Sequence, residues 1–221
     1  MPDKSDLKHL HPLTDSEQDF LKHKKKQLRY SKGENIFKQG AFAHYVIYVQ
    51  SGLIKVYLQT GYNKQINIRI AKAGDFLAFS SVFGEDVYTY SSVAIKDSQI
   101  CMIDKDGLKQ LLLKNNEFAM RITSNNYKIE KHLFKIIASI SYKQMRGKIA
   151  TALLYLSAKE FLDEDIFQHL TRQDIADFAS ISTESAIKFL KEFENEGILK
   201  LSGKEIFIIN NEKMENVAKN G

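Results

Sequence analysis

The sequence predicts an α+β protein of two domains, in which a small barrel of short β-strands precedes a long helix and a helical domain that ends in a β-hairpin. Three observations predict this order: short strand-like runs with glycines between them up to about Ile103, a helical periodicity after Asp104, and two short capped helices before residues 199–209. A chain of 221 residues is long enough for each domain to bury its own core. We expect the barrel domain at 1–114, the long helix at 115–141 and the last domain at 142–221.

The first domain is expected to open with a short helix and to continue as a small barrel or jelly roll. Thr14 and Glu17 have the spacing of a capping box, and the helix would run to the basic residues 23–26, which we expect to face solvent. Runs rich in β-branched and aromatic residues predict strands at 45–49, 53–58, 65–70, 92–95 and 100–103. Polar and apolar residues alternate in 65–70, which is typical of a strand with one buried face.

The long helix carries a narrow apolar stripe that predicts a homodimer. Six residues at helical spacing form the expected dimer seam: Phe118, Ile122, Asn125, Ile129, Leu133 and Ile136. A single polar residue within such a seam, here Asn125, is typical of two-stranded coiled coils. The alternative is an amphipathic helix that packs only on its own domain.

Residues 170–209 have the pattern of a winged helix-turn-helix. Thr171 and Ser182 are suited to cap two successive helices, which Ser180 and Ile181 would join by a tight turn. The expected inward residues are Ile175, Ala176 and Ala179 in the first helix and Ile187, Leu190 and Phe193 in the second. Gly197 would end the second helix, and Ser202-Gly203-Lys204 would turn the hairpin that forms the wing. The alternative is an ordinary pair of packed helices.

In a helix-turn-helix the second helix enters the DNA major groove, and outward side chains near its N-terminus contact bases. Thr183, Glu184 and Lys188 are therefore the expected base contacts. The N-terminal residues of the first helix, Thr171, Arg172 and Gln173, are expected to bind the DNA backbone together with Ser182 and Lys204. The net charge of +5 adds nothing to this prediction, because residues 142–221 carry slightly more acidic than basic side chains.

The composition disfavours several other classes of protein. No stretch has the apolar length of a membrane-spanning helix and the N-terminal residues do not look like a signal peptide, so we expect a cytoplasmic protein with no membrane partner. Cys101 is the only cysteine, and among the six histidines only His9 and His11 are close together, so we expect no metal site. A cupin-like metal enzyme would need ligands on facing strands, where only His44 stands, and we expect no catalytic residues.

Over nearly its whole length the chain resembles the Crp/Fnr family of transcription regulators. The resemblance rests on Gly33-Glu34-Asn35-Ile36-Phe37-Lys38-Gln39-Gly40, Gly52-Leu53-Ile54-Lys55-Val56-Tyr57, Gly74-Asp75-Phe76-Leu77 and Thr171-Arg172-Gln173-Asp174-Ile175-Ala176. It implies a cyclic-nucleotide-binding-like barrel, a dimerisation helix and a DNA-binding domain, with double-stranded DNA and RNA polymerase as partners. It also implies that Glu184 corresponds to the Glu of the family's recognition helix.

The chain departs from the family where ligands are bound. Members that bind cyclic AMP carry a Glu after Gly-Asp-Phe and an Arg-Ser pair further on, whereas this chain has Ala78-Phe79-Ser80 and Tyr88-Thr89-Tyr90-Ser91. A buried phosphate needs a cation, and neither of these segments supplies one, so we do not expect cyclic AMP to be the effector. The cysteine clusters of iron–sulfur members are missing and no haem signature stands out, so no cofactor is expected. An effector pocket, which could equally be ordinary barrel core, would be lined by Phe76, Phe79, Ser80, Tyr88, Thr89 and Tyr90.

Three further departures lie in the helix-turn-helix. Ser180 stands in the turn where the family usually has Gly, while Thr183 and Lys188 stand where many members have Arg. The expected function is therefore a sequence-specific transcription regulator with its own target sequence and with an effector other than cyclic AMP or none. The alternative is a sensory module that binds a protein partner and whose DNA contacts have degenerated.

Overall fold

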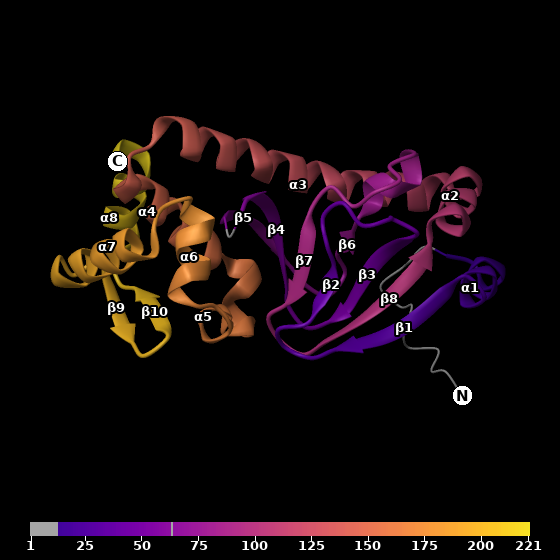
Figure 1. Cartoon of the computed structure of the whole chain (residues 1–221), viewed down its shortest axis with the longest axis horizontal. Coiled ribbons are helices and arrows are strands. Elements are labelled where there is room, and N and C mark those ends of the chain that lie inside the picture. The colour runs from indigo at the N-terminus through magenta and orange to yellow at the C-terminus, as the bar shows by residue number, and fades with distance from the viewer. Residues whose placement is uncertain (1–12, 63) are drawn as a thin grey trace. The chain divides into compact units, whose positions relative to one another are not determined.

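A computed structural model describes residues 13–62 and 64–221, and the chain divides into two compact units (Figure 1). The first unit comprises the residues up to Gln59 together with Arg69–Lys131. The second comprises Thr60–Ile68 and His132–Gly221. The predicted domain limits at 114/115 and 141/142 stay a prediction.

The barrel is built from two antiparallel four-stranded sheets, with strand orders β1-β8-β3-β6 and β2-β7-β4-β5. The strands are β1 (Lys25–Tyr30), β2 (Asn35–Phe37), β3 (Tyr45–Ser51), β4 (Ile54–Gly61), β5 (Lys64–Ala71), β6 (Phe76–Leu77), β7 (Ser91–Ala94) and β8 (Ser98–Asp104). Helices α1 (Asp15–Lys22) and α2 (Lys105–Lys114) and the 3-10 helix η2 (Phe79–Phe83) accompany them. The predicted fold class is confirmed, and each of the five predicted strands is present.

The basic run at 23–26 is exposed apart from half-buried Lys25, but the sequence analysis missed the strand β1 that starts within it. Lys25 and Lys26 begin β1 and pair with Ile103 and Met102 of β8. The residues of β1 are exposed or half-buried, so the sequence of this strand lacks the alternation of polar and apolar residues that would predict a strand. The strand forms because β8 supplies an edge to which it can hydrogen-bond. Since β8 lies far along the sequence, the local residues do not predict this pairing.

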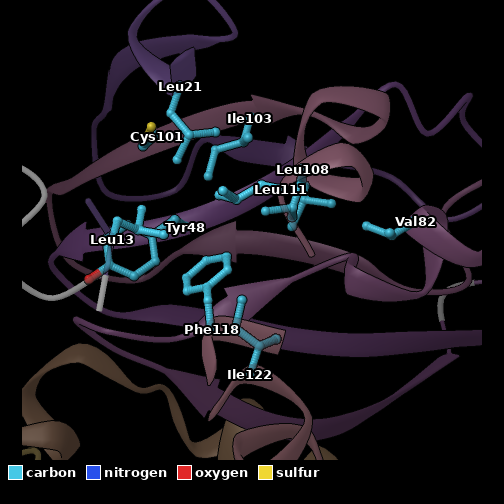
Figure 2. Packing of buried hydrophobic residues seen from close by; sticks show 11 residues of the cluster. Leu13, Leu21, Tyr48, Val82, Cys101, Ile103, Leu108, Leu111, Phe118 and Ile122 are labelled. Carbon is cyan, nitrogen blue, oxygen red and sulfur yellow. The ribbon is translucent and has the colours of Figure 1, made fainter. Parts of the chain in front are cut away.

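The barrel core joins the sheet of β3 and β8 to three helices (Figure 2). Val46, Tyr48, Cys101 and Ile103 of the strands pack with Leu21 of α1, Leu108 and Leu111 of α2, and Phe118 and Ile122 of α3 (Asn116–Tyr142), together with Leu13 and Val82. Each fully buried aliphatic or aromatic side chain contributes about 1.5–3 kcal/mol relative to an exposed one. The start of α3 is therefore held on the barrel by its own chain.

This packing removes Phe118 and Ile122 from the predicted dimer seam, and the rest of the seam stays a prediction. Phe118 and Ile122 are only 2% and 3% exposed, so neither offers a surface to a second chain. Ile129, Leu133 and Ile136 are half-buried, and Asn125 is exposed. The strongly exposed apolar side chains along α3 include instead Met120, Tyr127, Phe134 and Ile137, at 59% to 70% exposure, and Tyr142 at the end of the helix is 90% exposed.

The second unit is mostly helical. It contains α4 (Met145–Leu156), η3 (Lys159–Glu164), α5 (Ile166–His169), α6 (Arg172–Ala179), α7 (Thr183–Asn195), β9 (Leu199–Ser202), β10 (Glu205–Ile208) and α8 (Asn211–Asn220). Leu153 of α4, Ile175 of α6, Phe193 of α7 and Met214 of α8 are fully buried in it. No helix in the described part of the chain is long and apolar enough to cross a membrane.

Candidate nucleic-acid interface

Helix α6 begins with a capping box. The Thr171 hydroxyl oxygen accepts from the Asp174 backbone N–H at 3.0 Å, and the Asp174 carboxylate accepts from the Thr171 N–H at 2.8 Å. The Thr171 hydroxyl donates to the same carboxylate at 2.7 Å. Ile175, Ala176 and Ala179 are buried as predicted. The cap therefore fixes the first residue of α6, and the N–H and hydroxyl groups of Thr171 both donate within the protein.

A sharp turn at Ser180 separates α6 from α7. Ser180 has φ 55° and ψ 45°, which is the left-handed conformation that a tight helix ending requires. The Ile181 N–H then closes the turn on the Ala176 carbonyl oxygen at 3.1 Å. A residue with a Cβ adopts this conformation at a penalty of about 1–2 kcal/mol, which glycine would avoid.

Helix α7 presents a polar face near its N-terminus. The Ser182 hydroxyl oxygen caps it by accepting from the Ser185 N–H at 3.1 Å. Ala186, Leu190 and Phe193, spaced four and three residues apart, are at most 1% exposed and form the buried face. Ile187 is 39% exposed, so the prediction that it faces inward was wrong. Glu184 and Lys188 are exposed one turn apart, and Thr183 is half-buried.

The wing is a hairpin with a two-residue turn, which is tied to the start of α6. Ser202 pairs with Glu205, which leaves Gly203, with φ 60°, and exposed Lys204 to make the turn. The Arg172 guanidinium at the start of α6 donates to the carbonyl oxygens of Gly203 and Lys204, at 2.9 and 3.3 Å. Burial lowers the pKa of Arg172 from its ordinary value.

Charges on α7 are partly held by ion pairs. Lys188 Nζ lies 3.9 Å from Glu192 Oε1 and 5.9 Å from the centre of the Phe189 ring. Glu192 also lies 3.5 Å from Arg146, whose guanidinium makes a 2.6 Å ion pair with Glu196. A hydrogen bond from its own backbone N–H lowers the pKa of Glu184, which favours the carboxylate form of that side chain.

A chain of polar side chains links α6 to the first residue of α7. Gln173 Nε2 donates to Asp177 Oδ1 at 2.7 Å, and Gln173 Oε1 accepts from the Thr183 hydroxyl. Asp177 Oδ2 accepts from Gln65 Nε2 at 2.7 Å within the same unit. The prediction used Gln173 and Thr183 but overlooked Asp177. Its spacing of four residues from Gln173 on a helix is the signal that could have found it.

In the barrel, contacts divide the predicted effector-pocket residues into two aromatic groups. Phe76 packs against Tyr48 and Phe79, with ring centres 5.0 and 6.3 Å away, whereas Tyr88 stacks on Phe37 at 4.2 Å and Tyr90 lies 5.5 Å from it. Ser80 and Thr89 are exposed. The aromatic side chains thus have packing partners of their own, as ordinary barrel core does.

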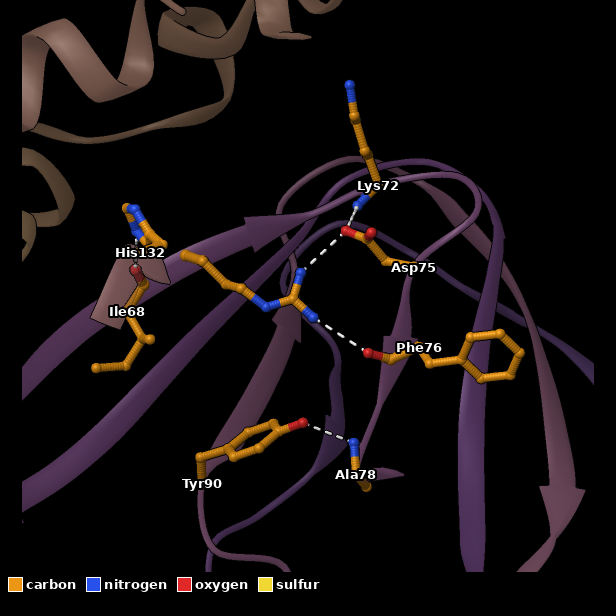
Figure 3. A network of polar contacts seen from close by, with 8 residues as sticks. Ile68, Lys72, Asp75, Phe76, Ala78, Tyr90 and His132 are labelled. Atoms are coloured by element: carbon orange, nitrogen blue, oxygen red, sulfur yellow. Dashed lines mark hydrogen bonds and ion pairs between the residues drawn. The ribbon is translucent and has the colours of Figure 1, made fainter. Parts of the chain in front are cut away.

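The sequence interpretation missed a buried cation, Arg69. The alternation in 65–70 predicts its outward placement, yet Arg69 is 7% exposed, and Asn67 in the same strand is fully buried. The Arg69 guanidinium donates to Asp75 at 2.9 Å and to the Phe76 carbonyl oxygen at 3.1 Å. In Figure 3 a separate dashed line joins Tyr90 to Ala78, because the Tyr90 hydroxyl accepts from the Ala78 N–H at 2.6 Å.

Metal ligands do not cluster in the described residues: none of the groupings of His, Cys, Asp and Glu there could hold a metal ion. His9 and His11, the closest histidine pair in the sequence, lie outside the described residues. Cys101 is a buried free thiol.

A barrel of two sheets followed by a winged helix-turn-helix defines a DNA-binding regulator with a separate N-terminal domain. The family model of the cyclic nucleotide-binding domain matches residues 27–115, and that of the Crp-like helix-turn-helix domain matches residues 147–217. The chain belongs to the Crp/Fnr family of transcription regulators.

Relatives and solved structures agree with this assignment. The chain is 27% identical over 194 residues to the fumarate and nitrate reduction regulatory protein of Vibrio cholerae, covering 85% of this chain and 76% of that protein. It is 26% identical over 181 residues to the anaerobic regulatory protein of Bacillus subtilis, covering 77% and 75%. The structure of FixK2 from Bradyrhizobium japonicum shares the fold with a TM-score of 0.76 at 19% identity, covering 87% of this chain and 96% of that one.

The c-di-GMP responsive global regulator CLP of Xanthomonas campestris has a TM-score of 0.75 at 18% identity, covering 88% of this chain and 99% of that one. The predicted function as a DNA-binding transcription regulator is thus confirmed, and the alternative of a degenerate DNA-binding domain is not favoured. The effector is not determined by these likenesses.

Proposed function

We propose that the N-terminal half of α7 enters the major groove of operator DNA and contacts bases through Thr183, Glu184 and Lys188. The observation that carries the proposal is the exposed position of Glu184 and Lys188 one turn apart, outside the buried face of a capped helix. The major groove admits a helix, and its base edges present both donors and acceptors to such side chains.

Each base contact has a chemical preference. A Glu184 carboxylate accepts only, so it pairs with the N4 amine of cytosine. Lys188 is a compact cation on a flexible stem, which donates to guanine O6 or N7 or to a phosphate with less geometric selectivity than Arg would have. Its 3.9 Å ion pair with half-buried Glu192 leaves Lys188 itself exposed, so the pair is weak and can be exchanged for a DNA contact.

Backbone contacts would come from the same ends of the two helices and from the wing. Arg172 keeps N–H groups beyond the two that bind the wing turn, and Lys204 is exposed at that turn. Gln173 and Ser182 use their side chains inside the protein, so they would offer backbone N–H groups at the helix N-termini to phosphate. The N–H and hydroxyl of Thr171 both donate to Asp174, so Thr171 would support the backbone contact by fixing the start of α6.

Selection of binding sites from random DNA tests these roles. Glu184→Ala is expected to relax base choice at one position per half-site, with a change in discrimination of about 1–3 kcal/mol. Arg172→Ala is expected to weaken binding to all sites alike and to reduce the slope of affinity against salt concentration. Recovery of the same consensus for wild type and Glu184→Ala would remove Glu184 from the base contacts.

We propose further that the dimer forms through the exposed face of α3 rather than through the seam predicted from the sequence. Met120, Tyr127 and Phe134 recur every seven residues and share one helix face, with Ile137 beside it. Burial of these side chains against a second copy would contribute about 25 cal/mol per Å² of apolar surface.

Two lysine substitutions distinguish the two faces. Tyr127→Lys is expected to give a monomer in light scattering at micromolar concentration, while Asn125→Lys, on the face first predicted, is expected to leave the dimer intact. A dimeric Tyr127→Lys protein beside a monomeric Asn125→Lys protein would restore the original seam.

Cyclic AMP and cyclic GMP are not proposed as effectors. Arg69, a buried cation that could meet a phosphate, is already paired with Asp75 and with the Phe76 carbonyl oxygen, so binding would first have to break these contacts. Isothermal calorimetry is expected to detect no binding of either nucleotide. Micromolar affinity that disappears in Arg69→Ala would show that the barrel is a nucleotide site after all.

We also propose that the protein holds no iron–sulfur cluster. A chain with one cysteine, buried Cys101, cannot supply the several thiolates of an iron–sulfur cluster, so anaerobic reconstitution with iron and sulfide is expected to leave no visible absorption band. We propose RNA polymerase as a protein partner and the cytoplasm as the compartment, because promoter DNA is found there, and we propose no catalytic activity.

A further inference from the structure

We propose that Asp177 is a positioning residue that turns Thr183 into a hydrogen-bond acceptor towards DNA, so that Thr183 favours adenine, cytosine or thymine over guanine at the base that it contacts. The inference rests on the proposed function, in which α7 contacts bases. It is carried by the polar chain of Asp177, Gln173 and Thr183 and by the donor and acceptor capacity of each group.

The chain begins at a carboxylate whose two oxygens each accept from a side-chain amide. Asp177 is 7% exposed, and its oxygens lie 2.7 Å from Gln173 Nε2 and 2.7 Å from Gln65 Nε2. An ionised carboxylate has no proton to donate. Asp177 therefore requires the NH₂ group of Gln173, and not its oxygen, to face it.

This requirement fixes the other end of the Gln173 amide. With Nε2 on Asp177, the oxygen Oε1 points the opposite way and meets the Thr183 hydroxyl. An amide oxygen only accepts, so the single hydroxyl proton of Thr183 is directed into the protein. The Asp177 carboxylate thus determines the orientation of the Gln173 amide. The shape of the amide alone would not, because its oxygen and its NH₂ group have nearly the same size.

Because the Thr183 hydroxyl already donates its proton to Gln173, it can act only as an acceptor in the major groove. Its oxygen keeps acceptor capacity, which suits the N6 amine of adenine or the N4 amine of cytosine, and its methyl group can pack on the thymine methyl. Guanine presents only the acceptors N7 and O6 along its own major-groove edge. Thr183 would need a donor there, and its hydroxyl proton is already used.

Asp177→Asn should reverse this order. An Asn amide can donate to Gln173 Oε1, which lets the Gln173 amide turn so that its NH₂ group faces Thr183. The Thr183 oxygen would then accept from Gln173, and its proton would become available to guanine. Asp163→Asn is the matched control, at an exposed position of η3 in the same unit. It removes one negative charge but leaves the hydrogen bonds among Asp177, Gln173 and Thr183 in place.

Selection of binding sites, followed by measurement of affinity for the four bases at the Thr183 position, tests the inference. Wild type and Asp163→Asn are expected to disfavour guanine there by about tenfold, the magnitude of one good base contact. Asp177→Asn is expected to lose most of that discrimination while keeping the preference at the Glu184 position. Thr183→Val is expected to lose the preference for amine-bearing bases and to keep any preference for thymine.

A nitrogen–proton NMR spectrum of the DNA-free protein gives an independent readout. One Gln173 side-chain amide proton is expected to exchange slowly with solvent, and its signal should shift in Asp177→Asn but not in Asp163→Asn. If wild type selects an operator and Asp177→Asn discriminates against guanine as strongly as wild type does, the inference is overturned while the proposed function stands. If wild type selects no site, both are overturned.

Discussion

Replacement of Ser180 by Gly should stabilise the helix-turn-helix, because Ser180 holds a left-handed conformation, with φ 55° and ψ 45°, at the end of α6. That conformation is unfavourable by about 1–2 kcal/mol for a residue with a Cβ. Gly removes this penalty but loses about 0.5–1 kcal/mol through the greater freedom of its unfolded chain. The balance is a gain of about 1 kcal/mol in the free energy of unfolding.

Hydrogen exchange measures this gain locally, without the assumption that the two units unfold together. Backbone amides of α6 and α7 that exchange through unfolding of the motif should slow about fivefold in Ser180→Gly, which is the equivalent of 1 kcal/mol. Ser180→Ala is the matched control, because it removes the hydroxyl and keeps the Cβ, and it should show no gain. Faster exchange in Ser180→Gly than in Ser180→Ala would refute the reasoning from backbone strain.

Three other substitutions test the packing, the charges and the pH dependence. Phe118→Ala should destabilise the first unit by about 3–5 kcal/mol in thermal unfolding, whereas Met120→Ala, two residues away but 70% exposed, should change monomer stability by less than about 0.5 kcal/mol. Glu192→Ala should free Lys188 and raise DNA affinity about two- to fivefold at low salt in fluorescence anisotropy, and a loss of affinity would contradict this. The pKa of Glu17 is lowered chiefly by a backbone N–H at the start of α1. The stability lost in Glu17→Gln at neutral pH should therefore shrink as the pH falls towards that lowered pKa, and a difference that grows as the pH falls would contradict it.

The parts of the fold that follow local rules could be predicted from the sequence. Runs of β-branched residues gave the strands β3, β4, β5, β7 and β8, and the capping residues Thr171 and Ser182 placed α6 and α7. These signals lie within a few residues of the elements that they define. The charged strand β1 has no such signal, because its pairing with β8 supplies what its own residues lack.

Other features depend on which surfaces meet in three dimensions. The long helix α3 has apolar residues on two faces, and periodicity alone does not tell that Phe118 packs on the barrel while Met120 faces solvent. Arg69 is buried because Asp75 and the Phe76 carbonyl oxygen receive its guanidinium, and Asp75 is separated from it by a turn of the chain. The contact of Gln173 with Thr183 requires the turn at Ser180, whose left-handed geometry is unusual for a serine.

Selection of binding sites from random DNA by the wild-type protein tests the central claim most directly, namely that two copies of the chain bind DNA through α7. The account predicts an enriched, two-fold symmetric sequence whose half-sites lie about 10 base pairs apart, one helical turn of DNA, so that each copy places one α7 in the major groove. Enrichment of a single asymmetric half-site would contradict the dimer, and the absence of any enriched sequence would contradict the account as a whole.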